Sequence, residues 1–104
     1  MPRESYRFSF QPSVPFAEAL LTLQLARIAA EGVYGDWAVR ISQGTQRFDE
    51  DRRAITLESD TDIGHAIARV FARFLEREFG EDAFTLTRST HAAAPWDQTD
   101  EVRR

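Results

Sequence analysis

Histidine and aspartate carry the most versatile chemistry in this sequence. His65 follows Asp60 and Asp62 closely, and His91 lies a few residues after the alternating segment 84–87. Imidazole and carboxylate groups together can bind a metal ion such as zinc or act as general acids and bases. The spacing of these four residues matches no known ligand motif, and an isolated histidine on a helix is most often an ordinary surface residue. A small enzyme or metal site around His65 is therefore the third of three functional hypotheses, and we expect no cofactor and no bound metal.

Two absences narrow the possible chemistry further. The chain has no cysteine, which removes thiol nucleophiles, disulfides and cysteine zinc sites. It also has no lysine, because all 13 basic residues are arginine, so Schiff-base chemistry and a P-loop lysine are impossible. No serine lies in a Gly-x-Ser-x-Gly elbow, and the glycines form no phosphate-binding loop.

The acidic residues fall into two groups that the expected topology separates. Asp49, Glu50 and Asp51 are followed by Arg52 and Arg53, a pattern typical of a solvated turn. The second group, Glu58, Asp60 and Asp62, lies at the start of a predicted helix, where negative charge is favourable. A predicted strand runs between the groups, so we expect them at opposite ends of the sheet rather than in one site.

Alternation of apolar and polar residues predicts four strands. They cover residues 6–10, 37–42, 54–58 and 84–87. Each has one apolar face, as expected for an antiparallel sheet that is covered on one side. The segment 44–53 is then the hairpin between the two middle strands.

Two helices are predicted between these strands. Residues 15–31 are rich in alanine and leucine, and Gly32 is the expected stop. Residues 61–79 carry apolar side chains at helical spacing and end before Gly80. On this second helix the wheel turns His65 away from the apolar face, toward solvent.

The order of these elements resembles the ferredoxin-like βαββαβ sandwich, an α+β fold. It implies a four-stranded antiparallel sheet in the order 4-1-3-2 with two helices on one face. We expect one domain over residues 1–88 and a polar, flexible tail over residues 89–104. The predicted core comprises Phe8, Phe10, Leu20, Trp37, Val39, Ile41, Ile55, Leu57, Ile67, Val70, Phe74 and Leu86.

Charge and patterning also bear on partners. The net charge is −4 and the sequence pI is about 5.1, which disfavours binding to a phosphate backbone. The sheet aromatics share the parity of the aliphatic residues, whereas the opposite face carries polar residues such as Arg7, Thr56 and Thr87. That face lacks a platform for stacking bases, so nucleic acid is an unlikely partner. No signal peptide and no apolar run of membrane-spanning length is present, so we expect a cytoplasmic protein that does not insert into a membrane.

The first helix has two apolar arcs. One contains Phe16, Leu20 and Leu23, and the other contains Leu21, Leu25 and Ile28. One arc is enough to cover the sheet, so the other packs on the neighbouring helix or on another chain. The leading hypothesis is therefore a non-catalytic protein-interaction or assembly domain that forms a homodimer, or binds another protein, through Leu21, Leu25 and Ile28. A small-ligand or regulatory binding module is the second hypothesis.

Overall fold

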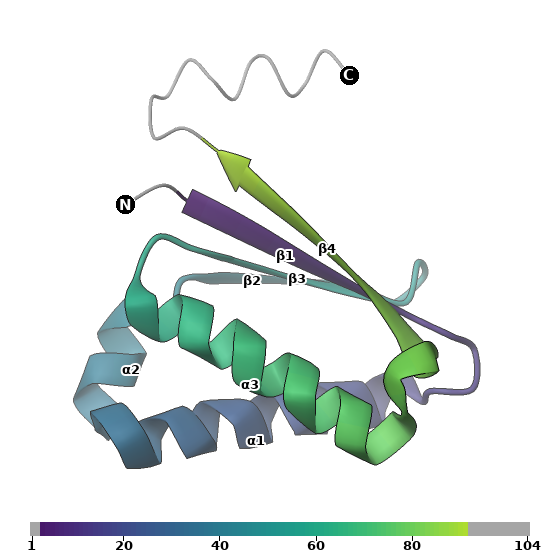
Figure 1. Ribbon diagram of the computed structural model, residues 1–104, viewed down its shortest axis with the longest axis horizontal. Coiled ribbons are helices and arrows are strands. Elements are labelled where there is room, and N and C mark those ends of the chain that lie inside the picture. The colour runs from purple at the N-terminus through teal and green to yellow at the C-terminus, as the bar shows by residue number, and fades with distance from the viewer. Residues whose placement is uncertain (1–2, 92–104) are drawn as a thin grey trace.

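A computed structural model describes residues 3–91 of the chain. It confirms the α+β class, with three α-helices and a four-stranded antiparallel sheet (Figure 1). The elements follow one another as β1 (Arg3–Phe10), α1 (Phe16–Tyr34), α2 (Asp36–Ser42), β2 (Thr45–Asp49), β3 (Ala54–Ser59), α3 (Asp62–Phe79), the short 3-10 helix η1 (Glu81–Ala83) and β4 (Phe84–His91).

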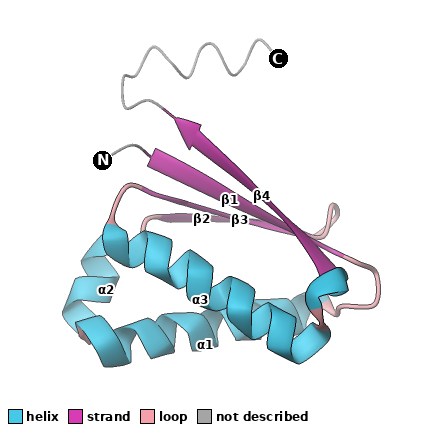
Figure 2. Ribbon diagram, viewed as in Figure 1, coloured by secondary structure: helices cyan, strands magenta, loops and turns pink. Residues whose placement is uncertain are grey.

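The sheet has the spatial order β2-β3-β1-β4, with β1 between β3 and β4. Phe8 of β1 lies opposite Ile55 of β3 and Leu86 of β4. Residues that lie opposite one another across strands share a face of the sheet. The apolar residues of β1 and β3 therefore form one continuous face, and Figure 2 shows the helices on one side of the sheet.

The core lies between this face of the sheet and the helices. Its largest fully buried side chains include Phe8, Ile55, Phe71 and Leu75. The rings of Phe8 and Phe71 are 4.7 Å apart and tilted, which is a favourable geometry for two aromatic rings. This contact joins the central strand to α3.

The predicted strand at residues 37–42 is wrong, because this segment forms helix α2. Gly35, at φ 94°, ends α1, and α2 begins at the next residue. In a helix, residues two apart point to opposite sides and residues four apart share a side. Val39 is accordingly buried, whereas Trp37 and Ile41 are exposed together and do not belong to the core.

The second strand comes instead from the segment expected to be a hairpin loop. β2 pairs with β3 so that Phe48 lies opposite Ile55. Of its five residues, TQRFD, only Phe48 is large and apolar. The strand is therefore held mainly by backbone hydrogen bonds, and its residues show no alternation of burial.

Several element ends and core positions also differ from the prediction. α1 continues through Gly32 to Tyr34, and β4 continues to His91, so residues 89–91 belong to a strand. Residues 92–104 of the predicted tail lie outside the described residues. Leu86 is exposed, because it lies near the open edge of β4, and three further predicted core residues are only partly buried: Leu20, Val70 and Phe74.

The turn between β2 and β3 is tied to the loop between β1 and α1. The Arg53 backbone adopts the left-handed region at φ 54°, and its carbonyl accepts a hydrogen bond from the Phe10 N–H at 2.9 Å. Its guanidinium donates to the carbonyls of Gln11 and Val14. Arg53 is therefore partly buried and anchored, unlike the exposed Arg52, with which the sequence grouped it as part of a solvated turn.

Candidate functional site

His65 is buried rather than exposed. Only 7% of its surface is accessible, and its Nε2 lies 2.9 Å from the carbonyl oxygen of Ser59. A carbonyl oxygen only accepts hydrogen bonds, so Nε2 carries the proton and donates it. The prediction of a solvent-facing imidazole is wrong because the first turn of α3 packs closely on the end of β3. The hydrogen bond from Nε2 connects the helix to the sheet, so this nitrogen is unavailable as a base or a metal ligand.

The other candidate residues do not assemble around His65. Asp60 and Asp62 are exposed on either side of Thr61, whose hydroxyl caps α3 by accepting a hydrogen bond from the Gly64 N–H at 3.0 Å. Among residues 3–91, no three histidine or acidic side chains are placed to hold a metal ion. The backbone of His91 pairs with Arg3 at the end of β1, and its side chain lies outside the described part of the structure.

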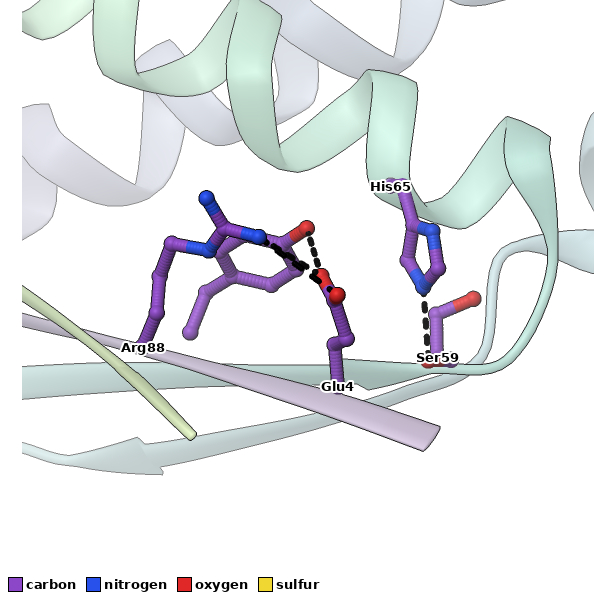
Figure 3. A network of polar contacts seen from close by, with 5 residues as sticks. Glu4, Ser59, His65 and Arg88 are labelled. Carbon is purple, nitrogen blue, oxygen red and sulfur yellow. Dashed lines mark hydrogen bonds and ion pairs between the residues drawn. The ribbon is translucent and has the colours of Figure 1, made fainter. Parts of the chain in front are cut away.

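A polar cluster that sequence patterning did not reveal lies beside His65 (Figure 3). The Tyr6 hydroxyl donates to Glu4 Oε1 at 2.5 Å, and Arg88 Nη2 lies 3.3 and 3.4 Å from the two Glu4 oxygens. The Arg88 guanidinium also lies over the Tyr6 ring, 5.4 Å from its centre. The register of β1 and β4 creates the cluster by placing Tyr6 opposite Arg88. Residues so far apart in the chain give no local sequence signal.

The electrostatics of this cluster favour a structural role. The hydrogen bond from Tyr6, and then the nearby Arg88, lower the pKa of Glu4. Burial, and then the bond to Glu4, raise the pKa of Tyr6. Both shifts move the titrations further from neutral pH, so Glu4 stays ionised and Tyr6 stays protonated there. The pair is a stable donor and acceptor rather than an acid–base couple.

Replacing Tyr6 with phenylalanine should raise the pKa of Glu4. The lost hydrogen bond is the largest cause of the lowered value, and Arg88→Gln, the matched variant, should also raise the pKa because it removes a nearby positive charge. Because the folded-state pKa is below the unfolded value of about 4.3, this carboxylate stabilises the fold above that pH. The contribution disappears as the pH falls through the folded-state pKa. Carboxyl-carbon NMR titration of Glu4 measures the shift; an unchanged pKa in Tyr6→Phe would contradict the assignment.

The outer face of α1 carries the most prominent apolar surface. Leu21, Leu25 and Ile28 are 59%, 57% and 60% exposed. The opposite face of the helix, which includes Leu23 and Ala26, is buried. Within residues 3–91, the arc containing Leu21, Leu25 and Ile28 therefore takes no part in the core, and we call it the α1 stripe.

A second feature lies between α1 and the edge strand β2. It is a groove of about 480 Å³ with apolar walls formed by Phe16, Leu20, Leu23 and Phe48. We call it the α1–β2 groove. Sequence patterning could not reveal it, because residues 44–53 were expected to form a hairpin loop rather than the edge of the sheet.

The open face of the sheet is polar, as expected. Tyr6, Phe8 and Phe10 are buried against the helices, and the opposite face of β1 carries Arg7 and Ser9. Arg40 and Ser42 belong to the predicted strand 37–42 and lie in α2 instead.

Fold and surface together define an α+β domain with an exposed apolar helix stripe and a groove at its edge strand. Comparisons with protein family models, with curated proteins and with solved structures find no match for this chain. None of the helices in residues 3–91 is both long and apolar enough to cross a membrane.

Proposed function

We propose that this chain is a non-catalytic assembly domain that pairs with a second copy of itself through the α1 stripe. One observation carries the proposal. Leu21, Leu25 and Ile28 lie on one face of α1, and each has more than half of its surface exposed. Their i, i+4, i+7 spacing makes them neighbours on that face. In this proposal the domain is a ferredoxin-like arrangement with α2 added between α1 and β2.

Pairing is favourable because it removes these three apolar side chains from water. Burying apolar surface is worth about 25 cal/mol per Å², and contiguous apolar patches on proteins mark interaction sites. The stripe has no role in covering the sheet, because the face of α1 that includes Ala19, Leu23 and Ala26 is already buried in the core. The stripe is therefore free to form a contact with a second copy of the chain.

A two-fold arrangement suits the order of residues along the stripe. When two copies of α1 cross near Leu25, Leu21 of one copy lies near Ile28 of the other, and the second contact repeats the first. Ala17 and Gly32 extend the stripe in either direction with little bulk, and among residues 3–91 no atom outside its own stretch of helix lies within 4 Å of the position of a Cβ at Gly32. Small residues at both ends allow the two helices to approach closely.

Leu25→Glu and Leu21→Glu should convert a dimer into a folded monomer. A buried carboxylate without a partner is strongly unfavourable in an interface, whereas it is readily solvated on the exposed helix of a monomer. Sedimentation velocity at micromolar concentration measures the mass, and circular dichroism checks the fold. Val33→Glu is the matched control, because Val33 is exposed on α1 but lies outside the stripe. The Val33→Glu variant should sediment with the mass of a dimer.

Two results would contradict this proposal. A monomeric wild-type chain in sedimentation would show that the stripe does not drive pairing. Unfolding of both stripe variants, with Val33→Glu intact, would show that the stripe belongs to the core instead.

A further inference from the structure

The α1–β2 groove exists because α1 does not cover the edge of the sheet. Phe48 lies opposite Ile55, on the helix side of β2, yet 53% of its surface is exposed. The groove volume of about 480 Å³ falls within the range of small-molecule sites. Its apolar walls are therefore available to a ligand without any change in the packing of the core.

The two ends of the groove differ in chemistry. β2 runs parallel to β1, because each is antiparallel to β3, and α1 runs back along the sheet after β1 (Figure 1). Phe16 therefore lies at the end of the groove near Glu50, while Arg27 lies at the end near Gln46. Along the helix axis, Phe16 and Arg27 are about 16 Å apart. The groove thus passes from an aromatic end to an end with a guanidinium and amides.

Arg27 is the unsatisfied group in this groove. Its Nε atom is buried, and among residues 3–91 it has no hydrogen-bond partner and belongs to no ion pair. A guanidinium presents paired N–H donors that match the two oxygens of a carboxylate. Gln24 and Gln46 line the same groove with amide donors. This end is therefore suited to a single negative charge.

From these features we infer that the α1–β2 groove binds a small organic carboxylate with an apolar body. The carboxylate pairs with Arg27, and the body lies against Leu20, Leu23 and Phe48. Glu50 at the opposite end disfavours a second negative charge, so a monocarboxylate is favoured over a dicarboxylate. This activity goes beyond self-association and does not depend on it, because the α1 stripe and the groove lie on different sides of the helix.

Titration of the full chain with sodium octanoate, followed by amide NMR signals, tests the inference. Octanoate should shift the signals of groove residues in β2 and α1. Arg27→Gln should weaken its binding at least tenfold, whereas Glu50→Gln, the matched polar change at the other end, should leave binding equal or tighter. 1-Octanol, which has the same chain length without the charge, should bind the wild type no better than octanoate binds Arg27→Gln.

A second variant keeps the test decisive if Arg27→Gln fails to fold. Phe48→Asp places a negative charge on the exposed apolar wall and should abolish octanoate binding. The inference is wrong if octanoate shifts no groove signals, if octanol binds equally well, or if the only signals that move are those of the α1 stripe. The Leu25→Glu chain should bind octanoate as the wild type does; this outcome separates ligand binding from the proposed pairing.

Discussion

Replacing Phe71 with alanine should lower the free energy of unfolding by about 3–5 kcal/mol. Phe71 is fully buried, and its ring contacts that of Phe8 across the interface between α3 and the central strand. Alanine would leave a cavity at the centre of the core. Because a small domain is stable by only about 5–15 kcal/mol, the variant should unfold at much lower urea concentration, as measured by circular dichroism.

Phe74 provides the matched comparison on the same helix. It is only partly buried, so part of its ring already contacts water in the folded state. Phe74→Ala should therefore cost less than Phe71→Ala, because less apolar surface is lost from the core. A larger loss for Phe74→Ala would show that the centre of the core has been assigned to the wrong phenylalanine.

Gly64→Ala should destabilise the fold by about 1–3 kcal/mol, although alanine is the better helix former. A Cβ at this position would lie 1.9 Å from Ser59 Oγ and 2.4 Å from Ser59 Cβ. Ser59 cannot yield freely, since its hydroxyl accepts a hydrogen bond from the Thr61 N–H at 3.1 Å. The start of α3 would have to move away from β3. Thermal unfolding, measured in the Leu25→Glu background to exclude association, gives the change.

Gly32→Ala is the control for this substitution. In the described part of the chain, nothing outside the local helix backbone lies within 4 Å of a Cβ at Gly32, which is also inside a helix. Alanine there should therefore stabilise the fold by up to about 1 kcal/mol. Ser59→Gly removes the clashing atoms and should recover part of the loss in the Gly64→Ala chain. Equal effects of alanine at Gly32 and Gly64 would show that α3 does not approach β3 so closely.

Patterning predicted the elements that bury one regular face. β1 and β3 alternate because Phe8 and Ile55 point into the core while Arg7 and Thr56 point to the other face of the sheet, and α3 has one apolar side. The α2 segment has the pattern of a strand because Trp37, Val39 and Ile41 alternate with other residues, and the segment is too short to distinguish a helical period from a strand period. β2 was missed because an edge strand with one apolar residue has almost no pattern.

The candidate sites also differ in whether a local sequence pattern predicts them. The α1 stripe was visible in the sequence, because residues of one helix keep fixed angles to one another. The cluster of Glu4, Tyr6 and Arg88 depends on the register between the first and last strands. The groove depends on how far α1 extends over β2. Neither is a property of any local segment. Glycine is a poor helix former, and the close approach of Ser59 explains why Gly64 lies inside α3.

The central position of β1 also constrains when the chain can fold during synthesis. β1 emerges from the ribosome first, but its two neighbours in the sheet are β3 and β4, which emerge much later. Until then its apolar face, with Phe8 at the centre, has no strand beside it. Pairing between segments distant in sequence closes large loops and slows folding. Nascent chains released before β4 should therefore remain open to proteases, and chains that include β4 should become protected only after its synthesis.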